Sequence, residues 1–334
     1  MILVFEYATA QGLNDPELLI EGKAMLEAIL KDLDGLDACY LISENIGEIR
    51  KFKTIRPLFL KKNESIYDWL EKNISNFNSC FFVAPESDME LYKLTKLIED
   101  SGIKIIGSNS DAVLKCSDKW LTYKSLKNKV NVIETYKVKN YKKEKIDGKL
   151  VLKPRDGVSC QNIKILDSIE ELSLKKIDNE KYLLQKFIEG KHVSVSLLSN
   201  GKIAVPISLN RQYISIKNGK MRYLGGLVPY KHPNAKSIMK TAKNAVESID
   251  GIKGYVGVDL VVSDRVYVVE INSRVTTPYI ALRELVNFNL GEAIINSVEG
   301  ILPSEVSINA KSCIEFKKED KDLKLVRIDE NCGI

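Results

Sequence analysis

The first 108 residues alternate short apolar runs with longer amphipathic stretches. The runs predict strands at residues 2–7, 38–42, 80–84 and 104–107. The stretches carry apolar residues at helical spacing and predict helices at residues 17–33, 66–77 and 89–100. Strands that alternate with helices are typical of a parallel sheet with helices on both faces. Because no GxGxxG motif follows the first strand, the pattern does not support a dinucleotide-binding role.

The rest of the chain changes from a helical to a mainly β pattern. Residues 109–129 are predicted to be helical, with Ser117 as a suitable N-cap. Further helices are predicted at residues 168–176, 234–249, 280–286 and 291–298. Strands are predicted at residues 130–138, 150–153, 182–187 and 310–316, with a β-rich region at 192–228. The predicted fold class is therefore α/β, with α+β lobes after the N-terminal part.

Residues 254–274, GYVGVDLVVSDRVYVVEINSR, place acidic side chains in an otherwise apolar β-hairpin. Two β-branched runs flank the turn residues 263–265, which are Ser, Asp and Arg. If only the last two of these form the loop, Asp259 lies directly opposite Glu270. A three-residue loop would instead move Glu270 opposite Val258.

This hairpin is predicted to hold a metal ion through Asp259, Glu270 and Asn272. Side chains alternate along a strand, so Asn272 shares a face with Glu270. Directly opposed residues have Cβ atoms roughly 4.5–5.5 Å apart, and like charges there repel. Mg²⁺ typically takes one or two protein carboxylates together with substrate phosphates, so this pattern indicates a metal–nucleotide site. The alternative is that both acids are exposed charges on the solvated face of the hairpin.

Composition and charge narrow the class of protein. The chain has 334 residues, 44% hydrophobic content and a net charge of +5. Its lysines form no long basic block, which argues against nucleic-acid binding. The modest positive net charge suits small anionic ligands. The six cysteines form no CxxC pair, which favours reduced thiols in a cytoplasmic protein. No apolar stretch approaches the roughly 20 residues of a membrane span, and the N-terminus is predicted to be a strand and not a signal peptide.

Two segments carry lysines suited to phosphate. VLKPRDGVSCQNI is a strand that places Lys153 before a loop with Gly157 and Ser159. Such a loop can aim backbone N–H groups at phosphate oxygens while the lysine supplies a point charge. CSDKWLTYK places Lys119 in the first turn of a helix, where the dipole does not favour a cation unless an anion lies nearby. A plain β-turn and ordinary surface exposure are the alternatives for the two segments.

A third segment, LLQKFIEGKHVSV at residues 183–195, is a strand, a short connector with Gly190 and a second strand. The connector could offer backbone groups to an adenine edge and a polar side chain to a ribose. By itself this is a weak signal. The order of segments favours a nucleotide site: a lysine at a helix start, a strand lysine before a glycine loop, this connector and then the acidic hairpin.

Together these motifs resemble the ATP-grasp superfamily of carboxylate–amine ligases over residues from about 110 to 300. The resemblance implies an ATP-grasp fold preceded by a parallel α/β domain. It divides the chain into an N-terminal substrate-side domain at 1–109, a small lobe at 110–190 and a large lobe with the metal-binding hairpin at 191–334.

The resemblance also implies roles for individual residues. The residues implied for ATP binding are Lys119, Lys153, Gly157, Ser159, Gln185, Lys186, Ile188 and His192. The residues implied for two Mg²⁺ ions, or for Mn²⁺ in their place, are Asp259, Glu270 and Asn272. The catalytic cations implied for the transferred phosphate and the reacting carboxyl are Arg211, Arg222 and Arg274. The chain departs from the family at Gln185 and His192, where many members have glutamate, and at Ser159-Cys160, which replaces a glycine pair.

The implied reaction is ATP-dependent amide formation through an acyl phosphate, with release of ADP and phosphate. The NRQ and GGLVP phrases, the FEYAT start and the length resemble archaeal ligases of methanofuran biosynthesis more narrowly. This implies that the side-chain carboxyl of L-glutamate is joined to the amine of tyramine, with Arg211 on the glutamate α-carboxylate. The alternatives are an ATP-grasp ligase with another acid and amine, and a non-catalytic nucleotide-binding regulator. A homodimer is a further expectation, whereas a nucleic-acid or membrane partner is not expected.

Overall fold

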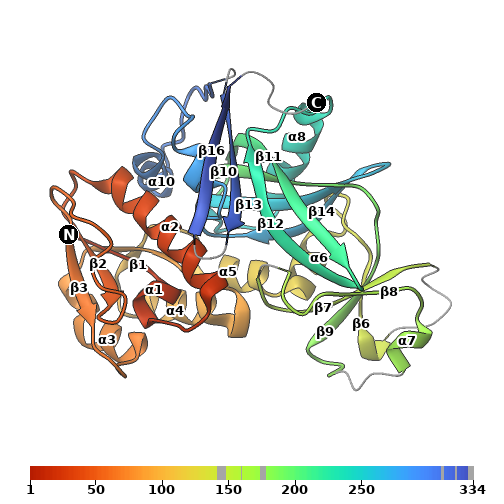
Figure 1. The fold of residues 1–334 in the computed structure, drawn as a ribbon, viewed down its shortest axis with the longest axis horizontal. Coiled ribbons are helices and arrows are strands. Elements are labelled where there is room, and N and C mark those ends of the chain that lie inside the picture. Colours follow the sequence, from red (N-terminus) through yellow and green to blue (C-terminus); the bar gives the residue numbers. More distant parts are fainter. Residues whose placement is uncertain (141–147, 159, 174–177, 310–311, 320–321, 330–334) are drawn as a thin grey trace.

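The structure is a computed structural model that describes residues 1–140, 148–158, 160–173, 178–309, 312–319 and 322–329. Two sheets organise these residues (Figure 1). Within the described residues, no helix has the length and apolar character needed to cross a bilayer. The division at residues 109 and 190 stays a prediction, although all strands of the first sheet do lie before residue 109.

The first sheet is parallel and occupies the red and orange part of Figure 1. Its order is β3-β2-β1-β4-β5. The strands are β1 Ile2–Glu6, β2 Ala38–Ser43, β3 Arg56–Leu60, β4 Ser79–Val83 and β5 Lys104–Ile105. The helices between them are α1 Tyr7–Gln11, α2 Pro16–Leu33, α3 Ile66–Asn73 and α4 Glu90–Asp100, with 3₁₀ turns at Ile74–Asn76 and Ser87–Met89. The predicted α/β pattern of this part is confirmed.

Strand β3 was missed because its segment, RPLFL, contains Pro57 and is followed by two lysines. Proline has no N–H to donate to a ladder, so this segment lacks a clear strand signal. The structure places β3 at the edge of the sheet, where proline is tolerated.

The second sheet is antiparallel and has eleven strands. Its main path is β14-β13-β10-β11-β12-β8-β7-β9-β6, and β15 pairs with both β12 and β16. The strands are β6 Thr135–Lys137, β7 Leu150–Pro154, β8 Lys164–Leu166, β9 Tyr182–Lys186, β10 Lys191–Asn200, β11 Ala204–Lys217, β12 Lys220–Val228, β13 Lys253–Val262, β14 Val266–Asn272, β15 Ser312–Glu319 and β16 Asp322–Asp329. The predicted final strand corresponds to β15, and β16 was missed.

The helices of this part are α5 Ser110–Ser117, α6 Lys119–Leu126, α7 Glu170–Ser173, α8 Ala235–Val246, α9 Tyr279–Leu282 and α10 Leu290–Val298, with a 3₁₀ turn at Val138–Asn140. The helical region predicted at 109–129 is thus two helices that meet at Asp118. Asp118 caps α6, because its carboxylate accepts from the N–H groups of Trp120 and Leu121. The predicted cap, Ser117, is the last residue of α5, so that prediction was wrong.

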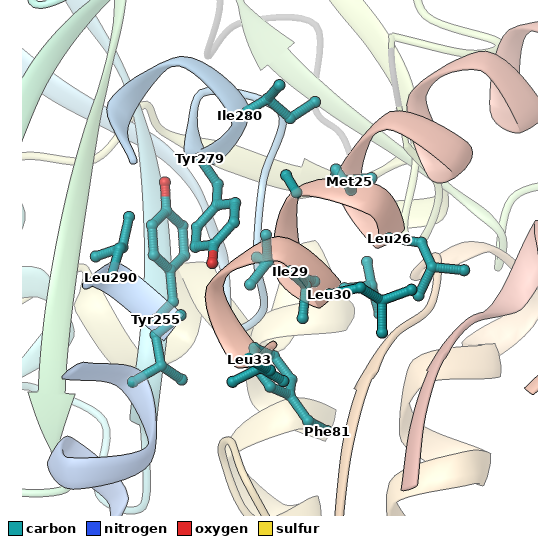
Figure 2. Packing of buried hydrophobic residues seen from close by; sticks show 14 of the residues in the cluster. Met25, Leu26, Ile29, Leu30, Leu33, Phe81, Tyr255, Tyr279, Ile280 and Leu290 are labelled. Atoms are coloured by element: carbon teal, nitrogen blue, oxygen red, sulfur yellow. The ribbon is translucent and has the colours of Figure 1, made fainter. Parts of the chain in front are cut away.

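An apolar cluster joins the two sheets through α2 (Figure 2). The α2 side chains that form it recur every three or four residues, namely Met25, Leu26, Ile29, Leu30 and Leu33. In Figure 2, Tyr279 lies on one side of α2 with Tyr255 of β13 beside it, whereas Leu26 and Leu30 point to the other side of the helix. The Tyr279 hydroxyl also donates to Asp32 of α2. Because α2 is fixed against the second sheet, its Glu21 side chain takes a defined position at the cavity described below.

Candidate active site

The acidic hairpin is formed by β13 and β14, and the predicted pairing of Asp259 with Glu270 is confirmed. The predicted two-residue loop is wrong, since residues 263–265 all lie between the paired strand ends. Three loop residues would by themselves move Glu270 away from Asp259. Val269, however, forms a β-bulge, an extra residue with no partner across the ladder, and restores the pairing beyond it. Asn272 lines the same cavity as both acids.

The two acids face a cavity and strongly influence each other. Burial raises the pKa of Asp259 well above its usual value, and the Glu270 carboxylate raises it further. Burial acts in the same direction on Glu270, but the ammonium groups of Lys119 and Lys153 outweigh it and lower the Glu270 pKa. Gln212 Nε2 donates to Asp259 Oδ1 at 3.0 Å and holds that carboxyl in place. The alternative of two exposed acids on a solvated face is therefore wrong.

The donor set at the hairpin fits a divalent cation that also binds phosphate. Asp259, Glu270 and Asn272 offer two carboxylates and an amide oxygen toward one cavity. In the described part of the chain, no group of three His, Cys, Asp or Glu side chains could hold a metal alone. A metal here would need further oxygen ligands, and the phosphates of a nucleotide would supply them.

Lys119 and Lys153 reach the same cavity from different elements. Lys119 is the first residue of α6 and Lys153 lies near the end of β7, and both are buried. Lys119 Nζ donates to the Gly157 carbonyl at 3.0 Å and lies 3.4 Å from Glu270 Oε2. Two buried ammonium groups beside a cavity are a strong attraction for a polyanion such as triphosphate.

A clamp between the two lysine-bearing segments fixes their relative position. Asp118 and Arg155 form an ion pair, and the Lys119 N–H donates to the Arg155 carbonyl at 2.8 Å. The loop that follows begins at Gly157, whose φ of 120° suits glycine. Ser159 lies outside the described residues. Cys160 lines the cavity, where burial raises its thiol pKa to about 12, so it is a neutral thiol.

The end of β9, the connector after it and the start of β10 also line the cavity, through Lys186, Ile188 and His192. Gln185, on β9 itself, is buried and donates from Nε2 to Thr135 Oγ1 at 2.6 Å. Burial lowers the pKa of His192, which keeps its imidazole neutral. The cavity lining also includes the apolar residues Ile133, Val151, Ile163 and Phe187. The adenine and ribose contacts of these residues stay predictions.

Comparison with known proteins decides the family. Residues 116–278 match a family model described as an ATP-grasp domain. Over 287 residues, the chain is 36% identical to tyramine–L-glutamate ligase of Methanocaldococcus fervens, covering 85% of this chain and 89% of that protein. The chain belongs to the ATP-grasp family. The tyramine–L-glutamate ligase of Methanocaldococcus jannaschii is 35% identical over 302 residues, or 89% of each protein. Among solved structures, an ATP-grasp superfamily protein of Archaeoglobus fulgidus matches with a TM-score of 0.75 and 28% identity over 99% of both chains.

Membership of the ATP-grasp family confirms the expected fold and the expected enzyme class. The protein is an ATP-dependent ligase that forms a C–N bond. ATP-grasp ligases use ATP with divalent metal ions, which agrees with the lysines and the acid pair found at one cavity.

Of the three predicted catalytic arginines, Arg274 lies in this ATP-grasp cavity. Its side chain is largely buried, and two nitrogens of its guanidinium already donate to a single carboxylate. Arg274 Nε donates to Glu86 Oε1 at 2.8 Å and Nη2 donates to Glu86 Oε2 at 2.7 Å. Glu86 follows β4 of the first sheet, so this pair connects that sheet to the acidic hairpin.

Arg211 is not brought to the cavity, which corrects its predicted role at the γ-phosphate and the glutamate α-carboxylate. On β11 it pairs with Val193 and Leu227, which belong to the apolar cluster behind the sheet. Its side chain is exposed and lies over the rings of Tyr213 and Tyr230, at 5.5 and 5.8 Å from their centroids. The following residue points to the opposite face, into the cavity.

Arg222 is also not brought to the cavity. Its neighbours on β12, Met221 and Tyr223, both line the cavity. Since successive side chains on a strand point to opposite faces, Arg222 points away and is exposed. Its predicted role on the transferred phosphate is corrected for the same reason.

Sequence reasoning missed three side chains that line the cavity or pair with a residue that lines it. Glu86 has the clearest signal, because it directly follows a predicted strand, and ligand sites of α/β sheets form at the carboxyl ends of strands. Glu21 on α2 and Lys318 on β15 have no local signal, since each looks like a surface charge in its own segment. The structure pairs these two with each other.

The pKa of Lys153 leads to a pH prediction. Burial, with the nearby Lys119 charge, lowers the Lys153 pKa to about 8. Lys153 is therefore positive below this pH and neutral above it, so kcat/KM for ATP should fall as the pH rises through about 8. Steady-state kinetics over pH 6.5–9.5 measures this, with far-UV CD to confirm that the protein stays folded.

Lys153→Arg is the matched variant for this experiment, because arginine stays protonated throughout the range. The variant should lose the alkaline fall in kcat/KM for ATP, even if its maximum is lower. An unchanged alkaline fall in Lys153→Arg would assign the titration to another group.

Proposed function

We propose that this ATP-grasp ligase joins the side-chain carboxyl of L-glutamate to the amine of tyramine, as expected for methanofuran biosynthesis. ATP would be consumed, and ADP and phosphate released. The observation that carries the proposal is the convergence of Lys119, Lys153 and the Asp259–Glu270 pair on one cavity. The choice of substrates is supported by the two tyramine–L-glutamate ligases, which match at 36% and 35% identity over 89% of their lengths.

The proposed nucleotide is ATP with Mg²⁺, or with Mn²⁺ in its place. Asp259, Glu270 and Asn272 would hold two metal ions, which when bound would neutralise charge on the phosphate oxygens. Lys119 and Lys153 would bind the phosphates, and the Lys119–Gly157 contact would hold the loop over them. Gln212 would keep Asp259 oriented toward the metal side of the cavity.

In the proposed reaction, a glutamate side-chain oxygen attacks the γ-phosphorus of ATP and ADP leaves. The product is an acyl phosphate. The tyramine nitrogen then attacks the acyl carbon, phosphate leaves with the former carboxyl oxygen, and the nitrogen loses a proton. Arg274 is the candidate for stabilising negative charge on the acyl oxygen, because it lines the cavity beside the hairpin.

The test is to incubate the purified protein with glutamate, tyramine, ATP and Mg²⁺ and to analyse the products by tandem mass spectrometry. We expect γ-glutamyltyramide and one ADP per amide, with none formed when ATP is left out. Tandem spectra distinguish the γ-amide from the α-amide. Turnover of another acid and amine but not of this pair would reject the proposed substrates. ATP binding without ADP formation from any pair would favour the regulatory alternative.

A further inference from the structure

An ion pair lies at the cavity and joins a residue of α2 to a residue of β15. It joins Lys318 Nζ to Glu21 Oε1, and the two side chains are only 16% and 11% exposed. Glu21 lines the cavity, whereas Lys318 lies beside it, its ammonium 5.8 Å from the ring centroid of the cavity residue Tyr223. Both come from outside the matched ATP-grasp domain at residues 116–278. The pair therefore lies outside the segment that the family model matches.

Glu21 is held toward the cavity by a second contact. Thr277 Oγ1 donates to Glu21 Oε2 at 2.6 Å, and Thr277 lies three residues after Arg274 at the end of the acidic hairpin. One carboxylate oxygen thus faces a hydroxyl and the other faces the Lys318 ammonium. The position of this carboxylate is fixed by contacts from both sides before any substrate binds.

Among the other described charges of the cavity, Lys186 is predicted to contact ATP, and the rest have roles in the proposed function. Lys119 and Lys153 account for phosphate, the acid pair accounts for metal, and Arg274 is paired with Glu86. A buried ion pair contributes little to stability, because the cost of desolvation offsets the attraction. Glu21 and Lys318 are instead two opposite charges fixed beside a cavity, and such an arrangement is complementary to a zwitterion.

We propose that Glu21 and Lys318 bind the amino-acid end of the acid substrate, Glu21 through its α-ammonium and Lys318 through its α-carboxylate. This inference rests on the proposed function, in which glutamate reacts at its side-chain carboxyl. Its α-ammonium and α-carboxylate are unchanged by that reaction, so they are available for recognition throughout. On binding, each substrate charge replaces one partner of the internal pair, and the site stays neutral. No covalent bond changes in this step.

Two truncated substrates test the two contacts separately. Glutarate is glutamate without the amino group, and 4-aminobutyrate is glutamate without the α-carboxylate. Each leaves one member of the ion pair without its substrate partner, so the wild type should prefer glutamate in kcat/KM by about 10²-fold or more over either. Rates are measured as ADP release with tyramine as the amine.

The variants should change these preferences in a crossed pattern. Lys318→Met should reduce the preference over 4-aminobutyrate to a few-fold and leave the preference over glutarate. Glu21→Gln, which keeps an acceptor for Thr277, should do the reverse. Neither variant should change KM for ATP more than a few-fold, since neither side chain belongs to the nucleotide site.

Matched controls come from the same elements. Lys317→Met removes the neighbouring lysine of β15, which pairs with Glu315 and lies over Tyr213. Glu17→Gln removes an exposed acid one turn earlier on α2. Both controls should keep the two wild-type preferences, and thermal unfolding checks that all four variants are folded.

The outcomes separate this inference from the proposed function. Glutamate turnover with unchanged preferences in Lys318→Met and Glu21→Gln would overturn the inference alone. An equal loss of rate for all three acids would show a structural ion pair and would overturn it too. No glutamate turnover by the wild type would contradict the proposed function and the inference with it.

Discussion

Glu270→Gln is expected to lower kcat for amide formation by about 10³-fold, the largest loss among the single substitutions considered. Glu270 is the proposed metal ligand that also lies 3.4 Å from Lys119 Nζ, so one change affects both the metal and a phosphate-binding lysine. The amide side chain keeps the size of the residue but not its charge. The measurement is single-turnover and steady-state ADP release with glutamate and tyramine.

The same substitution should change stability much less than activity. Removing the Glu270 charge relieves Asp259, whose pKa that charge raises, and this favours the folded state. The substitution also removes the negative charge that lies near the ammonium groups of Lys119 and Lys153, and this loss disfavours the folded state. We expect these opposed effects to leave the free energy of unfolding within about 1 kcal/mol of the wild type.

Asp264→Asn is the control for this experiment, because it removes an exposed carboxylate from the loop of the same hairpin. It should keep full activity. A Glu270→Gln protein that is largely unfolded, but whose folded fraction keeps normal specific activity, would contradict a catalytic site at the hairpin.

Glu86→Ala is expected to lower the free energy of unfolding by about 3–5 kcal/mol. Glu86 and Arg274 form a bidentate pair whose side chains are only 5% and 14% exposed. Truncating Glu86 leaves the guanidinium buried without its partner, and that uncompensated charge is the source of the cost. Urea denaturation followed by fluorescence and CD measures the change.

A double-mutant cycle distinguishes this pair from simple loss of packing. The double variant Glu86→Ala/Arg274→Met removes both charges, so it should be more stable than the sum of the single changes predicts, by about 1–3 kcal/mol. If Arg274 also acts on the acyl oxygen, its single variant should lose activity that the double variant does not recover. Additive stability effects would mean that the two charges do not depend on each other.

The sequence could predict the pairing of Asp259 with Glu270 because the signal for it is local. Asp259 and Glu270 stand in two adjacent β-branched runs, and any short loop brings such runs together. The exact register could not be predicted in the same way. The loop has three residues and the Val269 bulge compensates for the extra one, and neither feature has a residue signature as clear as an Asn-Gly turn.

The face on which an arginine lies depends on a single residue of register. Arg211 was predicted at the site, yet its neighbour Gln212 faces the cavity and contacts Asp259. A shift of one position exchanges the two faces of a strand, and a long β-rich region without clear alternation does not fix that choice. Arg222 points away from the cavity for the same reason, because side chains alternate between the two faces of β12.

The contributions of the first sheet could not be predicted because they depend on how the two sheets pack. Glu21 reaches the cavity only because the apolar face of α2 lies against Tyr279 and Ile280 (Figure 2). No local sequence pattern around Glu21 indicates that it contacts Thr277 and Lys318, its two partners in the structure. Long-range contacts of this kind are set by the whole fold.

The position of Lys318 far along the chain has a consequence for how the protein is made. During synthesis, all described residues proposed to bind ATP and metal, from Lys119 to Asn272, leave the ribosome before the β15–β16 hairpin does. A nascent chain at this stage still lacks the cation proposed for the glutamate α-carboxylate. The proposed amino-acid site is therefore completed only when β15 pairs with β12.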